Sequence, residues 1–160
     1  MKLLLLFTAL LISLPSFAQE QPRHEGYAPL EGMVGSWTIA GREGTYLETC
    51  AWYDGRRHII CNTESTRKDG SISRGMSILS FIPEHGYVYT GIGNSGRYET
   101  YRAGTYNNGI IEYLDQSAGS HTRIRIGPFS DKKAVPFNVE TSQDGTTWEQ
   151  ADSFEYVRVK

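Results

Sequence analysis

Hydrophobic and polar residues alternate with a two-residue period in short segments from residue 35 onward. In the segment 121–126 a threonine and two isoleucines fall on one face, and a histidine and two arginines on the other. The segment 134–141 places two valines and a phenylalanine opposite a proline, an asparagine and a glutamate. This period is typical of strands with one face in a core and one in water. The pattern therefore predicts an all-β protein.

Turn signals separate the alternating segments at short intervals. Most pair a glycine with a residue that suits a tight hairpin turn: Asp54-Gly55, Asp69-Gly70, His85-Gly86, Ser95-Gly96, Asn108-Gly109, Ala118-Gly119 and Asp144-Gly145. A first strand is expected from Gly35, after one short helical turn within Tyr27 to Val34. The further expected strands are Arg57 to Thr66, Ile72 to Ile82, Tyr87 to Ile92, Tyr98 to Tyr106, Ile110 to Leu114, His121 to Ile126, Val135 to Thr141 and Thr147 to Val159.

Antiparallel strands joined by short turns can form a sandwich or close into a barrel. A sandwich with Greek-key connections needs longer crossovers than most of these turns provide. Closure removes exposed strand edges without any crossover. We therefore expect an antiparallel up-and-down β-barrel of about eight to ten strands, preceded by a short helical turn.

The start of the chain has the pattern of a secretory signal peptide. Lys2 precedes an apolar stretch from Leu3 to Leu14, and small residues follow at Ser16 and Ala18. Twelve apolar residues are too few to span a bilayer, which takes about 20, and the flanks fit a cleavage site. We therefore assign 1–18 to a signal peptide, 19–34 to an N-terminal extension and 35–160 to the barrel domain.

Composition and charge narrow the functional classes. The chain of 160 residues is 39% hydrophobic and 21% charged and has 2 cysteines, which excludes a disordered chain or a disulfide-dense miniprotein. The formal net charge of −2 leaves no basic excess for phosphates, so we expect no nucleic-acid binding. No second long apolar segment follows the first. We expect a bacterial protein exported to the periplasm or secreted, without a transmembrane segment after cleavage.

The two cysteines lie on either side of a strong turn signal, which favours a disulfide bond. Cys50 and Cys61 flank Tyr53-Asp54-Gly55-Arg56, and in a hairpin centred there they are directly opposite or nearly so. Side chains at such positions approach closely enough for a bridge. The alternative is a redox or nucleophilic thiol, but neither a Cys-x-x-Cys spacing nor a His-Asn context accompanies them.

The first expected strand opens with a motif that resembles a known superfamily. Gly35-Ser36-Trp37, after a helical turn, resembles the Gly-x-Trp opening of lipocalins and their calycin relatives. In that superfamily a basic residue of the last strand packs across the tryptophan, and Arg158 matches it. A guanidinium over an indole gains about 0.5–2 kcal/mol. The resemblance implies structural roles for Gly35, Trp37 and Arg158.

The resemblance extends over most of the chain and carries expectations about function. From Leu30 to Arg158 the sequence is similar to bacterial exported lipocalin-like proteins filed as domains of unknown function. It has no Thr-Asp-Tyr motif of the central lipocalins. Residues 42–46 are too short for the helical lid of the fatty-acid-binding branch. The resemblance implies a barrel that binds a small ligand rather than an enzyme.

Residues capable of catalysis or metal binding form no recognised motif. There is no His-x-His, clustered Cys/His or calcium-loop spacing, and Gly93 to Gly96 lacks the spacing of a nucleophile elbow. Scattered acidic side chains are interpreted as solvated strand faces: Glu48, Glu99, Glu112 and Asp115. We expect no metal and no catalytic residue. A haem-type barrel, with His58 or His121 as iron ligand, stays open as an alternative, as does an enzyme with an unrecognised site.

Aromatic side chains are the most suggestive feature, with 10 Tyr in the chain. A barrel of this size can enclose one small ligand between aromatic walls, although aromatic residues also fill β-protein cores. We expect a non-enzymatic protein that binds a small hydrophobic or amphiphilic ligand. The candidate wall residues are Trp52, Tyr87, Tyr89, Tyr101, Tyr113 and Trp148, with Tyr98 and Tyr106 on the same strands.

A protein inhibitor is the alternative from a different class. Ser95-Gly96-Arg97-Tyr98 is similar to the Ser-Gly-x-Arg/Lys-Tyr loop of periplasmic lysozyme inhibitors, but is one residue shorter. In those inhibitors the serine and the basic side chain pair with carboxylates in the enzyme's cleft. An inhibitor should present Ser95 and Arg97 on an exposed, ordered loop, whereas a carrier needs an open internal cavity.

Overall fold

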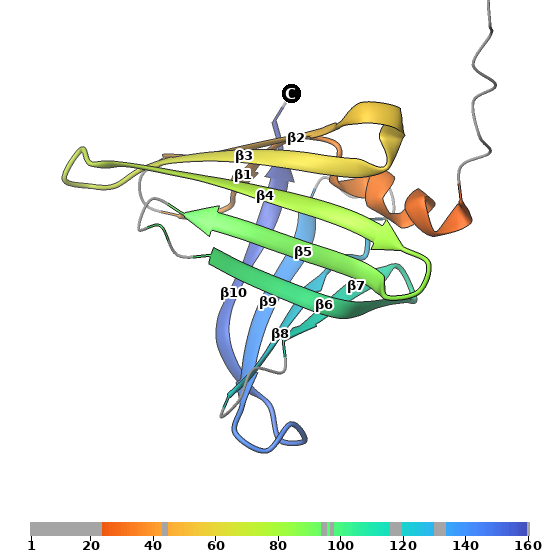
Figure 1. Ribbon diagram of the computed structural model, residues 1–160. Coiled ribbons are helices and arrows are strands. Elements are labelled where there is room, and N and C mark those ends of the chain that lie inside the picture. The colour runs from red at the N-terminus through yellow and green to blue at the C-terminus, as the bar shows by residue number, and fades with distance from the viewer. Residues whose placement is uncertain are drawn as a thin grey trace, which may run out of the picture.

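Ten antiparallel strands follow one another around a single closed barrel (Figure 1). The computed structural model describes residues 24–42, 45–93, 96, 98–115, 120–129 and 134–159, and gives the backbone alone at 54, 98, 99, 102 and 103. The expected signal peptide, residues 1–18, lies outside the described residues. The strands are β1 (Gly35–Ile39), β2 (Thr45–Trp52), β3 (His58–Thr66), β4 (Ile72–Ile82), β5 (Gly86–Gly93), β6 (Tyr98–Asn107), β7 (Ile110–Asp115), β8 (His121–Ile126), β9 (Ala134–Ser142) and β10 (Glu149–Arg158).

The barrel closes where the first strand pairs with the last. In that antiparallel pair Trp37 stands opposite Arg158. Just beyond it, the Val159 N–H donates to the Ser36 carbonyl at 2.9 Å. Every other strand pairs with its neighbours in sequence, so no connection crosses the sheet. The expected up-and-down barrel is confirmed.

The alternation of side chains places the core as the sequence pattern predicted. In β8 the side chains of Ile124 and Ile126 are buried inside the barrel. Arg123 lies on the outer face, where its Nε donates to a Glu140 carboxylate oxygen at 2.8 Å. Apolar positions on the inner face and charged positions on the outer face are what a half-buried strand requires.

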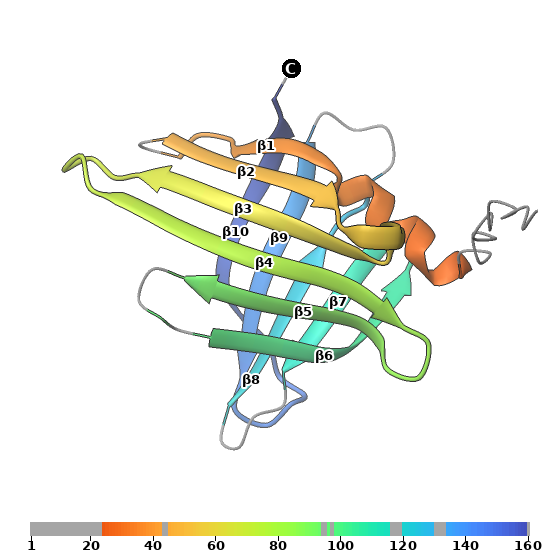
Figure 2. The same ribbon diagram turned by 45° about the horizontal axis from the view of Figure 1, so that its top comes forward.

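A short 3-10 helix, η1 (Glu25–Met33), covers one end of the barrel (Figure 2). Its buried side chains, Leu30 and Met33, face the core. The Met33 carbonyl accepts a hydrogen bond of 2.8 Å from the Trp37 indole N–H, and the Gly26 carbonyl accepts one of 2.9 Å from the Tyr87 hydroxyl. The expected helical turn is confirmed, and it closes this end of the barrel.

A disulfide bond joins β2 to β3. Cys50 and Cys61 stand directly opposite in the register of the two strands, and their sulfurs are 2.06 Å apart. Between the strands lies a second 3-10 helix, η2 (Asp54–Arg56), in which Gly55 and Arg56 both take positive φ. The disulfide expected from the hairpin spacing is confirmed.

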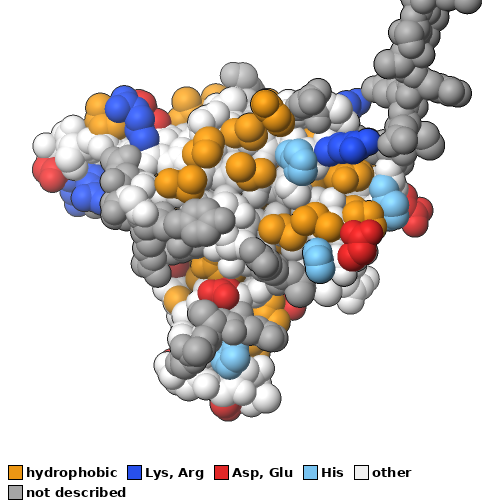
Figure 3. All heavy atoms as spheres, in the orientation of Figure 1, with side chains coloured by type: hydrophobic (Ala, Val, Ile, Leu, Met, Phe, Trp, Pro, Cys, Tyr) orange, Lys and Arg blue, Asp and Glu red, His pale blue; other side chains and the backbone are white. Residues whose placement is uncertain are grey.

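The outer face formed by β3, β4 and β5 carries apolar side chains in separate groups among uncharged polar atoms (Figure 3). Met76 and Ile92 are cross-strand neighbours and are exposed on this face. Charged side chains gather at the tip of the β3–β4 hairpin, where Arg74 pairs with Glu64 at 2.9 Å.

In the part of the chain that the structure describes, no helix has the length and apolar character needed to cross a membrane.

Candidate ligand-binding cavity

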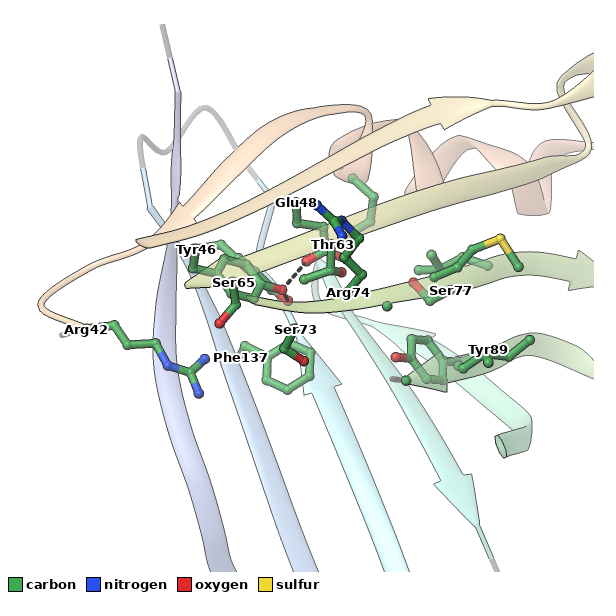
Figure 4. A pocket seen from close by; sticks show the side chains of 18 of the residues that line it. Arg42, Tyr46, Glu48, Thr63, Ser65, Ser73, Arg74, Ser77, Tyr89 and Phe137 are labelled. Atoms are coloured by element: carbon green, nitrogen blue, oxygen red, sulfur yellow. Dashed lines mark hydrogen bonds between the residues drawn. The ribbon is translucent and has the colours of Figure 1, made fainter. Parts of the chain in front are cut away.

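The barrel encloses a cavity of about 480 Å³, within the range of small-molecule sites. It extends from Met33, at the end of η1, to Arg67 and Ser73 at the β3–β4 hairpin. Figure 4 shows its side chains from close by, with Arg42 to one side of the others. The site is therefore a pocket closed by η1 at one end and open at the other.

One wall of the cavity is polar. It is built from β2, β3 and β4, whose inward positions form cross-strand pairs such as Glu48 with Thr63 and Ser65 with Ser73. Cys50 and Cys61 are buried at inward positions of β2 and β3. Residues two positions away along a strand share its face, so Glu48 and Thr63 also point inward. The polar wall consists of Tyr46, Glu48, Thr63, Ser65, Ser73 and Ser77.

A second wall is apolar and aromatic. Its members come from η1, β4, β5, β8, β9 and β10, and they are Met33, Leu79, Tyr89, Ile126, Phe137 and Tyr156. Phe137 makes an edge contact with Tyr156, with ring centres 5.5 Å apart. The cavity is therefore amphipathic, which suits a ligand with both a polar and an apolar part.

Three glycines at inward positions leave space between the walls. Gly75 stands opposite Gly93, and Gly91 stands opposite Ser77, in the β4–β5 pair. A Cβ atom added to Gly93 would meet no atom within 4 Å. A glycine in a strand lacks a side chain to pack and is unfavourable there. At these positions it keeps the interior of the barrel open.

A buried carboxyl group flanked by two tyrosines is the chemical centre of the polar wall. The Tyr46 hydroxyl donates to Glu48 Oε2 at 2.8 Å, and the nearby Tyr156 hydroxyl lowers the pKa of the Glu48 carboxyl group. The two hydroxyls are 3.3 Å apart. Glu48 is only 6% exposed, so the three groups form one network inside the barrel.

Burial dominates the protonation of this network. It raises the pKa of Glu48 above its ordinary value, against the opposing effect of the two tyrosine hydroxyls. It also raises the pKa of Tyr46 and of Tyr156, and the neighbouring Glu48 charge adds to both shifts. The tyrosines therefore remain protonated donors at neutral pH and cannot serve as bases there.

The residues expected to close the barrel come together at its end. The Arg158 guanidinium carbon lies 4.2 Å from the centre of the Trp37 ring, and Nη1 donates to the Val34 carbonyl at 2.9 Å. A Cβ atom on Gly35 would overlap Nη1 of Arg158. Gly35 therefore permits the contact, and all three residues lie in structural positions outside the cavity lining.

Of the six expected aromatic wall residues, Tyr89 lines the cavity. Tyr101 and Tyr113 pack against its ring, with ring centres 5.6 and 5.8 Å away. Tyr113 is completely buried, and its hydroxyl has no hydrogen-bond partner among the described residues. These two tyrosines therefore support the wall and do not form part of its lining.

Three other expected wall residues lie elsewhere. Tyr87 donates to η1 at the closed end, and the Trp52 indole N–H donates to a Glu31 carboxylate oxygen of the same helix at 2.9 Å. Trp148 lies on the outer face, where the Arg123 guanidinium stacks over it at 4.2 Å. The structure thus brings Trp52 and Tyr87 to the η1 closure and leaves Trp148 outside the barrel.

Trp148 lies outside the barrel because the register of β9 and β10 shifts between Gln150 and Asp152, so that Gln150 stands opposite Glu140 of the outer face. The last strand also begins later than the sequence predicted. A strand was expected from Thr147, but β10 starts at Glu149. Asp144 accepts the backbone N–H groups of Thr146 and Thr147 at 2.8 and 2.7 Å. These N–H groups are therefore unavailable to the sheet, and the turn continues to Trp148.

The described histidines do not point into the cavity. His58 lies on the outer face, with Nδ1 2.7 Å from the Ser80 hydroxyl, and His121 lies on the outer face of β8 beside Gly145. Among the described residues, one group could bring three metal-ligating atoms together: Glu48, Cys50 and Cys61. The two sulfurs are bonded to each other, so they cannot act as thiolate ligands.

The loop that resembles lysozyme inhibitors cannot be placed. Ser95 and Arg97 lie outside the described residues. The inhibitor hypothesis therefore stays a prediction.

Sequence reasoning missed Tyr46 and Glu48, the centre of the site. Glu48 was interpreted as part of a solvated strand face. The signal that could have placed it is the spacing Tyr46-x-Glu48-x-Cys50, since a disulfide to the neighbouring strand fixes which face points inward. Tyr156 was considered only as a neighbour of Arg158. Alternation alone does not show which strands meet across a barrel.

The arrangement can bind and orient a ligand through hydrogen bonds, one carboxyl group and aromatic rings. The sequence matches no protein-family model and no curated protein. The functional conclusion therefore rests on the geometry of the cavity.

Proposed function

We propose that this protein is an exported, bacterial, lipocalin-like carrier that binds one small amphiphilic molecule inside its barrel without catalysing a reaction. The observation that carries the proposal is the amphipathic cavity of about 480 Å³, closed by η1 and open at the opposite end. Such a volume suits a single small ligand.

The two walls explain why an amphiphilic ligand fits better than a purely hydrophobic one. An apolar molecule against Ser65, Ser73 and Ser77 would remove their hydroxyls from water without replacing the lost hydrogen bonds, which is unfavourable. A ligand with one polar group can satisfy that wall while its apolar part packs against Leu79 and Phe137.

Three further features support the lipocalin-like and exported parts of the proposal. The contact of Trp37 with Arg158 matches the closure that the family resemblance implies. A disulfide bond is typical of proteins that fold in an oxidising compartment. The apolar segment near the chain start has the form of a signal peptide.

Filling the cavity tests the proposal. In Gly93→Phe the new ring would enter the open space at this position. In Thr90→Phe, the control, the same ring stands on the outer face of the same strand, opposite Ile78. We would titrate both variants and the wild type with N-phenyl-1-naphthylamine, a neutral probe that fluoresces when it leaves water.

We expect one probe per wild-type chain, unchanged binding in Thr90→Phe and at least about tenfold weaker binding in Gly93→Phe. Circular dichroism would verify that both variants are folded. Equal binding by the two folded variants, or no binding by the wild type, would contradict a carrier function of the cavity.

A further inference from the structure

Glu48 carries a carboxyl group into the cavity without a positively charged partner among the described residues. The side chains around it are Trp37 across β1, Thr63 across β3, the disulfide at Cys50, and the two tyrosines. Burial and the tyrosine hydroxyls set its pKa, and no cation contributes. A buried carboxylate normally has a counter-charge, because its transfer out of water is costly.

Three arginines line the cavity, Arg42, Arg67 and Arg74, and all three are exposed to water. Arg74 is paired with Glu64 on the outside of the hairpin. The Arg42 guanidinium lies 5.8 Å from the centre of the Tyr46 ring and is exposed. Figure 4 shows Arg42 apart from Glu48, on the far side of Tyr46. These arginines therefore leave the charge of Glu48 uncompensated.

We infer that the ligand's polar group is a cation, an alkyl- or arylammonium that takes Glu48 as its counter-ion inside the barrel. This inference rests on the proposed carrier function and specifies the chemical class of its ligand. An ammonium group supplies the positive charge that the polar wall lacks.

The groups around Glu48 fit an ammonium in two ways. A carboxylate offers about four acceptor positions, of which the hydrogen bond from Tyr46 uses one, so acceptor capacity remains. The rings of Tyr46 and Tyr156 flank the carboxyl group, with ring centres 6.1 Å apart, and aromatic faces attract cations. The apolar part of the ligand can then lie against Phe137 and Tyr89.

The same geometry disfavours an anionic head group inside the cavity. A second carboxylate near Glu48 would be repelled in a region of low dielectric constant, where like charges interact strongly. The exposed Arg42, Arg67 and Arg74 are too well hydrated to offset this repulsion at Glu48. A fatty acid is therefore expected to bind worse than an amine of equal length.

Three probes of one chain length separate these possibilities: octylamine, 1-octanol and octanoate. At neutral pH they carry a positive, a zero and a negative charge on the same apolar chain. We would titrate each into the wild type, into Glu48→Gln and into Glu155→Gln by isothermal calorimetry. Glu155→Gln removes the same charge from the same sheet, but from an exposed outer position on β10, opposite Pro136.

We expect octylamine to bind the wild type at least about tenfold more tightly than 1-octanol, and octanoate to bind most weakly. Glu48→Gln should abolish the preference for the amine and leave 1-octanol affinity within about twofold. Glu155→Gln should keep the wild-type order. A thermal unfolding scan would verify that each variant is folded.

Failure of this inference is distinguishable from failure of the carrier function. If 1-octanol or octanoate binds as tightly as octylamine, or if folded Glu48→Gln keeps the amine preference, the cation inference is wrong and the carrier stands. If none of the three probes binds the wild type, both proposals are contradicted.

Discussion

The Arg158 guanidinium lies over the Trp37 ring at 4.2 Å and donates to the Val34 carbonyl, 124 positions away in the sequence. One side chain of the last strand thereby contacts both the first strand and the segment that leads out of η1. This contact joins the two ends of the barrel domain.

We predict that Arg158→Ala lowers the free energy of unfolding by about 1–2 kcal/mol, the sum of a partly exposed cation–π contact and a hydrogen bond. Urea denaturation would measure the loss. Arg158→Lys keeps the charge but not the planar fork, so we expect an intermediate value. A stability equal to the wild type in Arg158→Ala would mean that the contact contributes nothing to closure.

Gly35 should not tolerate a side chain. Its φ of +135° lies in a region that is essentially restricted to glycine, where another residue costs about 1–3 kcal/mol. A Cβ atom there also overlaps Arg158. We therefore expect Gly35→Ala to destabilise the protein more than Gly41→Ala in denaturation measurements.

Gly41→Ala is a matched control, because Gly41 also has positive φ but no atom lies within 4 Å of an added Cβ. If the two variants lost equal stability, the overlap with Arg158 would be irrelevant. In an Arg158→Ala background, we expect part of the cost of Gly35→Ala to disappear.

Removal of the disulfide should destabilise the barrel without changing its topology. Replacing both Cys50 and Cys61 by alanine frees a loop with a sequence separation of 11, worth about 3 kcal/mol in the chain-entropy model. Denaturation with and without reductant would measure this cost. The wild type should lose stability in reductant, whereas the double variant should not respond.

Glu48 should make stability depend on pH. Because its pKa is raised in the folded protein above the ordinary 4.5, the folded state holds this proton more tightly than the unfolded chain. The contribution is fully present below the unfolded pKa and is lost as pH rises through the folded pKa.

We therefore predict that Glu48→Gln, which cannot ionise, is more stable than the wild type at neutral pH. Below pH 4.5 the advantage should vanish, since Glu48 is then protonated in both states. Thermal midpoints measured across this range would test the prediction.

The short turns favoured a closed barrel over a sandwich, and the structure confirms it. The residue pattern by itself determined the all-β class, most strand positions and the disulfide. These features are local, or depend on one repeated rule. Alternation with period two assigns Ile124 and Ile126 to the core, glycine-containing pairs mark the hairpins, and equal spacing from one turn places Cys50 opposite Cys61. Each can be read from a few neighbouring residues.

Only the tertiary structure decided which side chains share the cavity. Tyr46 and Tyr156 are 110 positions apart, and they meet because β2 and β10 both pair with β1 once the sheet has closed. The register shift between Gln150 and Asp152 placed Trp148 on the outer face. The amphipathic site depends on closure and register around the whole barrel, because these fix which inward positions face one another across its interior.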